Sequence, residues 1–409
     1  MSTIVIKNIK GLVQVRDKAP FSIAGTAMKE LPILENAYLL LQNGKILDYG
    51  KMEDFSFSEK ADEIIDATGK FVLPTFVDSH THSVFARTRE EEFVDRINGL
   101  TYEEIALRGG GILNSAQKLQ DESEEELYQD AKKRVEQMIR YGTGALEIKS
   151  GYGLNTEAEL KMLRVIRRLN ETMPIPIKAT FLAAHAFPKK YKENHQGYID
   201  EIIHEMLPEI GKNKLADYID VFCERNYFSV EEMGEILTAG QKYGLKPKVH
   251  VNQFTVLGGV ERAVELGAIS VDHLEEIDDY DIKVLKASNC IPTVLPGCSH
   301  FINIPFANAR HMIDEGLPLA LASDFNPGST PNSNMSVVWS LACIKMRLTP
   351  EEAFNAMTIN TAKALELEEE FGTITRGKRG SIMITKEIPS LAYIPYSFGD
   401  QLIERVIIN

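Results

Sequence analysis

Four side chains have the types and spacing of a metal-binding site. His80 and His82 lie two residues apart after an apolar run, so on a strand both imidazoles point to the same side. His250 lies in KVHVNQF and Asp324 in LALASDFNPG. Taken singly, the pair of His80 and His82 fits a polar loop, His250 fits a hydrogen-bonded core histidine, and Asp324 fits a turn cap. Together, three imidazoles and one carboxylate without cysteine make a nitrogen and oxygen site that suits zinc or ferrous iron.

Such a site is suited to hydrolysis, because a divalent ion lowers the pKa of bound water toward about 7 and polarises a carbonyl. Asp324 could ligate through one oxygen and accept the water's proton with the other. His273, in VDHLEE, is placed to hold a developing oxyanion or to relay a proton. The alternative for His273 is a hydrogen bond that only supports another site residue.

The elements that must position these residues alternate along the middle of the chain. Apolar strand-like runs are mostly separated by amphipathic helical stretches, such as 156–170 and 229–244. Eight buried strands that alternate with helices predict an α/β fold, a (β/α)8 TIM barrel. The predicted strands lie at 71–82, 144–154, 177–187, 218–224, 246–254, 269–277, 291–297 and 318–328.

In such a barrel the carboxyl ends of the strands carry the chemistry. Five of the nine histidines lie at predicted strand ends, and scattered placement would not readily give that clustering. The seventh strand, IPTVLPG, supplies no ionisable group. The residues at the other strand ends are His80, His82, Tyr152, His185, Glu224, His250, His273 and Asp324.

Both ends of the chain have short β-like runs. Asn43-Gly44 between apolar runs predicts a hairpin, and GTITRGKRGSIMIT and QLIERVIIN are β-rich and broken by glycine. We therefore expect a small, β-sandwich-like satellite domain built from residues 1–70 and 366–409, beside a barrel formed by residues 71–365.

Two further features lie near the predicted site. Arg89 follows the first strand and could bind a substrate carboxylate bidentately, or it could pair on the surface with a neighbouring glutamate. The loop containing Gly109–Gly111 lacks the Gly-Lys-Ser/Thr sequel of a P-loop, which favours a mobile loop over the barrel mouth. Whether it closes over substrate stays open. Tyr152 stands between glycines directly after a strand, which favours an exposed site tyrosine.

The bulk properties exclude several classes of function. A formal net charge of −14 argues against nucleic acid and against an anionic membrane surface as partners. The sequence has neither a signal-peptide pattern nor an apolar stretch near the length of a membrane span. Its four cysteines are widely spaced and are expected to be reduced core thiols. These features predict a cytoplasmic protein.

The strand-end residues resemble those of the amidohydrolase superfamily. His80 and His82 on the first strand, His250 on the fifth, His273 on the sixth and Asp324 on the eighth match its pattern. The usual lysine on the fourth strand is absent, since that strand ends in IDVFCE. The resemblance therefore implies a single metal ion, either Zn²⁺ or iron as Fe²⁺ or Fe³⁺.

Within that superfamily the sequence resembles the imidazolonepropionase family over nearly its whole length. The stretches that carry the resemblance are REEEFVDRINGLTYEEIALRGGGI, LEIKSGYGL, TFLAAHAFP, DYIDVFCE, SVDHLEEI and ASDFNPGSTP. This family hydrolyses the ring C–N bond of 4-imidazolone-5-propanoate to N-formimino-glutamate in histidine degradation. The substrate carries a propionate, which favours the substrate-binding interpretation of Arg89.

The resemblance assigns roles residue by residue. It implies that the metal ligands are His80, His82, His250 and Asp324, with Asp324 and His273 also catalytic. Some members have a glutamate at the position of Gln253; a glutamine there can still hydrogen-bond the ring of the substrate, so Gln253 is assigned to substrate binding. The implied substrate contacts are Arg89, Tyr152, His185, Gln253, Asn326, Gly328 and Ser329, with Tyr102 a weaker candidate.

Two alternative functions stay open. The first is a related deaminase or another cyclic amide hydrolase of the same superfamily. The second is a non-catalytic barrel scaffold, although such a protein is expected to have lost one or more ligands. Barrel enzymes with a satellite sheet are often dimers, which leaves a homodimer open as well.

Overall fold

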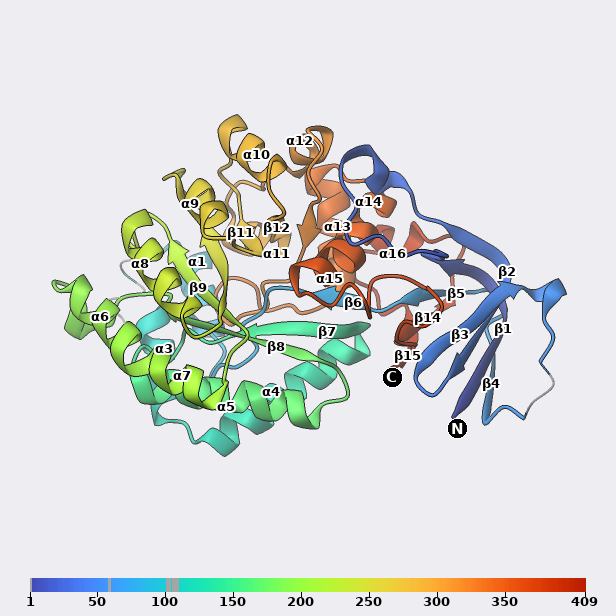
Figure 1. The fold of residues 1–409 in the computed structure, drawn as a ribbon, viewed down its shortest axis with the longest axis horizontal. Coiled ribbons are helices and arrows are strands. Elements are labelled where there is room, and N and C mark those ends of the chain that lie inside the picture. Colours follow the sequence, from blue (N-terminus) through green and yellow to red (C-terminus); the bar gives the residue numbers. More distant parts are fainter. Residues whose placement is uncertain (1, 58–59, 101–103, 105–109) are drawn as a thin grey trace.

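The larger part of the chain forms a barrel of parallel strands surrounded by helices (Figure 1). The computed structural model describes residues 2–57, 60–100, 104 and 110–409. Neighbouring barrel strands are consecutive in the chain, and the bridge between Thr81 and Phe325 joins the last strand to the first. The predicted (β/α)8 fold is confirmed. The barrel strands are β6 (Phe76–Asp78), β7 (Thr143–Lys149), β8 (Ile177–Ala184), β9 (Tyr218–Cys223), β10 (Lys246–Val251), β11 (Ser270–His273), β12 (Ile291–Val294) and β13 (Ala320–Leu321).

Helices follow most strands and cover the outside of the barrel (Figure 1). Several begin with a capping box, in which a Ser or Thr and a Glu three residues later satisfy each other's backbone N–H groups, as Ser123 and Glu126 do. The longer helices are α1 (Glu90–Ile97), α3 (Ile112–Asp121), α4 (Glu124–Arg140), α5 (Thr156–Thr172), α8 (Val230–Gln241), α10 (Asp279–Lys286) and α13 (Met335–Met346). The shorter ones are α6 (His195–Glu201), α7 (Leu207–Asn213), α9 (Gly259–Glu265), α11 (Pro296–Ile302), α12 (Ala309–Asp314), α14 (Pro350–Asn355), α15 (Thr361–Ala364) and α16 (Tyr393–Tyr396). Short 3-10 turns lie at η1 (Gly25–Lys29), η2 (Met52–Asp54) and η3 (Lys189–Tyr191), and π turns at η4 (Ile202–Met206) and η5 (Ala356–Asn360).

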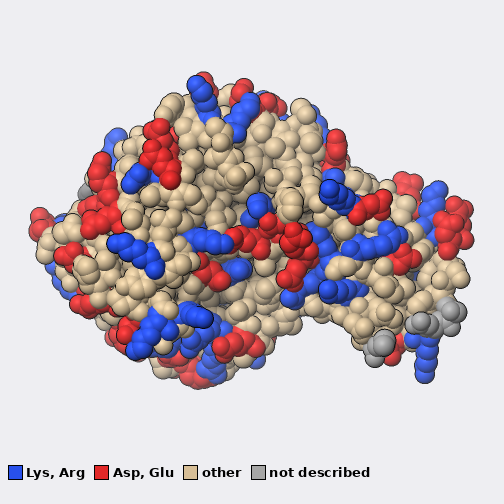
Figure 2. Space-filling model, in the orientation of Figure 1, with Lys and Arg blue, Asp and Glu red and all other residues tan. Residues whose placement is uncertain are grey.

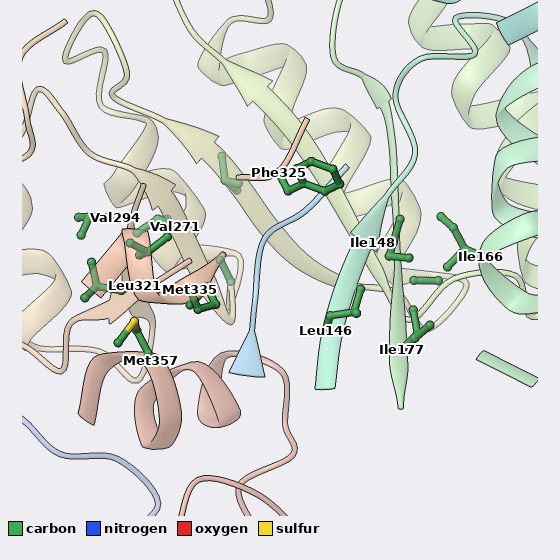
Figure 3. Close-up of a cluster of buried hydrophobic side chains, with 14 of the residues drawn as sticks. Leu146, Ile148, Ile166, Ile177, Val271, Val294, Leu321, Phe325, Met335 and Met357 are labelled. Carbon is green, nitrogen blue, oxygen red and sulfur yellow. The ribbon is translucent and has the colours of Figure 1, made fainter. Parts of the chain in front are cut away.

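The main core lies between the strands and the surrounding helices (Figure 3). Alternate residues of a strand point to opposite faces of the sheet. On β7, Leu146 and Ile148 belong to this core together with Ile166 of α5. The residues between and after them, Glu147 and Lys149, are buried and charged, and they face the inside of the barrel.

A seven-stranded sheet lies beside the barrel and is built from both ends of the chain (Figure 1). Its path runs β15-β14-β5-β1-β2-β3, and β4 pairs with β1. It has a buried apolar cluster of its own. Its strands are β1 (Thr3–Val13), β2 (Ile33–Gln42), β3 (Lys45–Lys51), β4 (Glu63–Asp66), β5 (Lys70–Pro74), β14 (Ile382–Glu387) and β15 (Ile403–Ile407).

The long strand β1 pairs with β2 along one edge and with two strands, β4 and β5, along the other. Residues 4–7 pair with β4, residues 11–12 pair with β5, and Asn8 between them has a φ of 55°. The predicted hairpin is confirmed, since Asn43 and Gly44 both have positive φ and connect β2 to β3.

The apolar run predicted as one strand at 71–82 is divided in the structure. Residues up to Pro74 belong to β5 of the small sheet, and the barrel strand β6 begins at Phe76. The chain therefore passes from the small sheet into the barrel at Thr75. The domain boundaries near residues 70 and 365 remain a proposal.

Acidic and basic side chains are interspersed over the face of the molecule in Figure 2. Within the described ranges, every helix is too short or too polar to cross a membrane.

Candidate active site

A cavity of about 370 Å³ opens at the carboxyl end of the barrel strands, and most residues selected from the sequence line it. His80 is fully buried next to this cavity, with its ring centroid 4.5 Å from that of His250. The selected residues that line the cavity are His82, Arg89, Tyr152, His185, His250, Gln253, His273, Asp324, Asn326, Gly328 and Ser329.

The two ends of the barrel sheet meet at His80. The backbone N–H of Asp324 donates to the carbonyl of His80 at 3.0 Å, and the N–H of His82 donates to the carbonyl of Phe325 at 2.8 Å. Asp324 has a φ of 53° and His273 a φ of 89°, both in the left-handed region. Such backbone strain costs about 1–3 kcal/mol per residue and gathers at functional sites.

Three imidazoles form a compact cluster in the cavity floor. The ligand atoms of His80, His82 and His250 lie within 4.8 Å of one another, close enough to hold one metal ion. Nδ1 of His80 donates to Asp272 at 2.7 Å, and Nδ1 of His250 donates to Asp220 at 2.9 Å. These bonds leave the Nε2 atoms of His80 and His250 as the free ligand atoms of their rings.

The protonation state and the unpaired nitrogen atoms of the histidine cluster fit a metal ion. The Nε2 atoms of His80 and His250 are buried without a hydrogen-bond partner, which is costly unless another partner takes their lone pairs. Burial, and then the charge of Lys149, lowers the pKa of His80. Burial, and then the neighbouring His185, lowers the pKa of His82. Both rings are therefore neutral, as metal ligands must be.

Asp324 completes the donor set. One carboxylate oxygen, Oδ1, lies 3.6 Å from Nε2 of both His80 and His82. The other, Oδ2, accepts from Ser329 Oγ at 3.3 Å and from Thr330 Oγ1 at 3.4 Å. Burial raises the pKa of this carboxyl, so its ionised form needs a nearby cation. An ion held by the three imidazoles would supply one.

His273 has an acidic partner. Its Nδ1 lies 3.4 Å from Glu275 Oε1, which also accepts from the Ser299 hydroxyl at 3.1 Å. Burial alone would lower the pKa of His273, but the carboxylate of Glu275 raises it above its ordinary value. The pair can therefore hold and release a proton next to the metal cluster.

Arg89 lies at the cavity wall and pairs with Glu92. Its Nη2 is 2.7 Å from Glu92 Oε2, and its Nε donates to both carboxylate oxygens at 3.0 Å. Glu92 also accepts from the backbone N–H of Gly111 at 2.9 Å. The glutamate pairing considered from the sequence is thus present. It does not place Arg89 on the open surface, because the side chain is only 12% exposed and lines the cavity.

Gly328 leaves room for this arginine. A Cβ at Gly328 would lie 2.2 Å from Arg89 Nη1, so alanine there would push the guanidinium aside. The displaced group is the end of a flexible side chain, which can move without unfolding the protein. Gly328→Ala is therefore expected to raise KM about 10-fold, since small misplacements of positioning groups are costly. Steady-state kinetics would measure the rise in KM, and thermal denaturation would show that the variant stays folded.

The double variant provides the control for that prediction. The double variant combines Arg89→Ala with Gly328→Ala. If Gly328→Ala acts through the arginine, the KM of the double variant should be close to that of Arg89→Ala alone, because the effects of coupled residues do not add. Additive effects would instead place the role of Gly328 elsewhere.

The remaining selected residues fall into two groups. The rings of Tyr152 and His185 stand on one wall beside His82, and His185 stacks on His82 with centroids 5.3 Å apart. The prediction of an exposed tyrosine was wrong, because Tyr152 is only 3% exposed, although it lines the cavity. Asn326 organises the loop after β13, since its Oδ1 accepts from the N–H groups of Gly328 at 2.8 Å and Ser329 at 2.7 Å. This loop carries Asp324, Gly328 and Ser329 to the cavity.

Some selected residues do not line the cavity. Glu224 accepts from the backbone N–H groups of Phe254 at 2.8 Å and Thr255 at 3.2 Å, and so holds the loop that follows β10. Tyr102 and Gly109 lie outside the described residues.

The cavity also contains residues that sequence reasoning missed. Arg96 lies seven residues after Arg89, about two helical turns, and its Nη1 lies 3.5 Å from the carbonyl of Gly328. That spacing is a signal that could have found it. Phe222 and Tyr227 add aromatic walls. Glu275, two residues after His273, was also missed; it does not line the cavity but contacts Nδ1 of His273.

Residues 71–409 match the amidohydrolase family model, and the chain belongs to that family of hydrolases. Guanine deaminase from E. coli shares the fold, with a TM-score of 0.75 and 14% identity over 100% of this chain and 98% of that one. A zinc-bound adenosine deaminase from Xanthomonas campestris gives a TM-score of 0.71 at 13% identity, over 100% of this chain and 92% of that one.

Among curated relatives, the chain is similar to imidazolonepropionases, as the sequence motifs predicted. It is 59% identical to that of Flavobacterium johnsoniae, over 99% of this chain and 98% of the relative. It is 45% identical to that of Clostridium tetani, over 94% of this chain and 92% of the relative.

Proposed function

We propose that the chain hydrolyses the ring amide C–N bond of 4-imidazolone-5-propanoate to give N-formimino-L-glutamate. The observation that carries this proposal is the meeting of three buried imidazoles and Asp324 with Arg89 in one cavity. The full-length similarity to imidazolonepropionases supports it.

His80, His82, His250 and Asp324 would hold one divalent metal ion, zinc or iron. When bound, that ion would polarise the carbonyl under attack and make water a nucleophile near neutral pH. The partnerless Nε2 atoms of His80 and His250 and the buried carboxylate of Asp324 support this ligand set.

Arg89 would bind the propionate of the substrate, because a guanidinium matches a carboxylate bidentately. The pair with Glu92 fixes the direction of the guanidinium before substrate arrives. Tyr152, His185 and Gln253 would surround the imidazolone ring, and Asn326, Gly328 and Ser329 would shape the wall opposite. The role of Tyr102 as a further contact stays a prediction.

Asp324 would accept the proton of the attacking water. The hydroxyl of that water ends in the new carboxylate, and its proton ends on the ring nitrogen released by C–N cleavage. His273, held by Glu275, would steady the negative charge that develops on the carbonyl oxygen or pass the proton on.

A direct assay tests the proposal. Purified protein is expected to remove the ultraviolet absorbance of 4-imidazolone-5-propanoate, to lose this activity with a strong chelator, and to regain it when zinc or iron is added back. Elemental analysis of the same samples should show about one ion per chain. Absence of both bound metal and activity after reconstitution would favour the scaffold alternative.

A comparison of turnover rates with 4-imidazolone-5-propanoate and with a nucleobase separates this function from that of a deaminase. A neutral nucleobase offers nothing for Arg89 to bind, so turnover of a nucleobase in preference to the propionate substrate would contradict the proposal. A cytoplasmic location and a homodimer remain predictions.

A further inference from the structure

Five charged side chains fill the inside of the barrel next to the metal cluster. Each is at most 1% exposed, and they come from four strands. They are Glu147 and Lys149 of β7, Asp220 of β9, Lys248 of β10 and Asp272 of β11. The proposed mechanism uses none of them, and buried charges are costly unless they are paired.

Lys149 stands between the carboxylates of this group. Its Nζ lies 2.9 Å from Asp220 Oδ2 and 3.6 Å from Asp272 Oδ2, and it also contacts Glu147 Oε1 at 2.8 Å. Lys248 is buried to the same extent but has different partners. Its Nζ lies 3.0 Å from Glu147 Oε2 and donates to the carbonyl of Ser79 at 3.1 Å. Among the described residues, the ion pair of Lys248 is with Glu147 alone.

The two aspartates that contact Lys149 are those that orient the histidines. Asp220 Oδ2 accepts from Nδ1 of His250, and Asp272 Oδ2 accepts from Nδ1 of His80. In each case the oxygen that holds the imidazole is the one that lies nearest to the lysine. One cation is thus in contact with the acceptors of two of the three imidazoles in the cluster.

We infer that Lys149 is a positioning residue that sets the affinity of the histidine cluster for its metal ion by fixing Asp220 and Asp272. Carboxylate partners of metal-bound histidines set ring orientation and ligand basicity, and their loss typically lowers metal affinity about 10- to 100-fold. Lys149 acts one contact further out, on both carboxylates at once. The inference rests on the metal site of the proposed function.

The charges of the group allow a test that separates contact from net charge. Two cations and three carboxylates leave one negative charge in excess. Lys149→Met and Lys248→Met both raise that excess to two, but only the first removes the contacts to the aspartates. The double variant Glu147→Gln/Lys149→Met removes those contacts and keeps the excess at one. It also guards against failure of the single variant to fold.

The measurement uses full-length protein loaded with zinc and challenged with chelators of graded affinity. Lys149→Met and the double variant are expected to bind zinc about 10- to 100-fold more weakly than the wild type. Lys248→Met should bind it as tightly or more tightly, because added negative charge attracts a cation. Cobalt-substituted samples should show an altered visible absorption spectrum for the two Lys149 variants alone.

Two results would overturn the inference. Zinc affinity of the double variant equal to that of the wild type would show that the lysine contacts do not matter. Equal losses in Lys149→Met and Lys248→Met would show a general effect of removing a buried cation. A separate result bears on the proposed function itself: a wild type that binds zinc no more tightly than His250→Ala has no metal site there, and the inference falls with it.

Discussion

Asp324→Asn is expected to lower kcat/KM about 1,000-fold, within the range that a lost general base typically costs. The amide of asparagine cannot accept a proton, and it is a weaker metal ligand than a carboxylate. Asparagine has the same shape and also tolerates the left-handed backbone at this position, where φ is 53°. The loss should therefore come from the chemistry rather than from misfolding.

Asp78→Asn is the matched control for this variant. Asp78 is another fully buried carboxylate at the barrel closure, where it accepts from the backbone N–H of Ser323, but it does not line the cavity. We expect it to keep kcat/KM within about 10-fold of the wild type, since it takes no part in proton transfer. Thermal denaturation and metal analysis of both variants complete the comparison. Equal losses of activity would move the base role away from Asp324.

The barrel could be predicted because its strands are buried on both sides and its helices are amphipathic. Strand limits were less predictable. The predicted eighth strand, 318–328, pairs with β12 only at Ala320 and Leu321, because the chain then turns through Asp324 to build the site and meets the first strand at the bridge between Phe325 and Thr81. The first predicted strand joined two elements, since the apolar pattern continues through Pro74 while the chain changes sheet.

The candidate metal ligands could be predicted because their spacing matches strand ends, where chemistry is expected. The residues that hold them could not. Asp272 meets His80 across 192 positions of sequence, and Lys149 meets Asp220 across 71. These contacts depend on strand register, such as the pairing of His250 with Asp272, which alternation of residue types does not determine. The pattern of Glu147 and Lys149 within an apolar strand was the available signal of a charged barrel interior.

Arg89→Ala is expected to raise KM about 30-fold or more, with less effect on kcat and none on metal content. A hydrogen bond to a charged group contributes about 1.5–3 kcal/mol, which corresponds to about 10- to 150-fold in affinity. The arginine presents two such donors. Arg89→Lys should recover only part of the loss, because an ammonium keeps the charge without the planar fork.

The partner of Arg89 complicates the single variant. Removing the Arg89 guanidinium leaves the buried carboxylate of Glu92 without its cation, which is destabilising by itself. Arg89→Met/Glu92→Gln removes both charges together, so it should be more stable than Arg89→Ala while keeping the high KM. Glu92→Gln alone keeps the guanidinium, and its KM should rise less because the arginine is only loosened. If KM for the propionate substrate were unchanged in Arg89→Ala, the carboxylate would have to be bound elsewhere. Arg96 of α1, the helix that Arg89 caps, would then be the next residue to test.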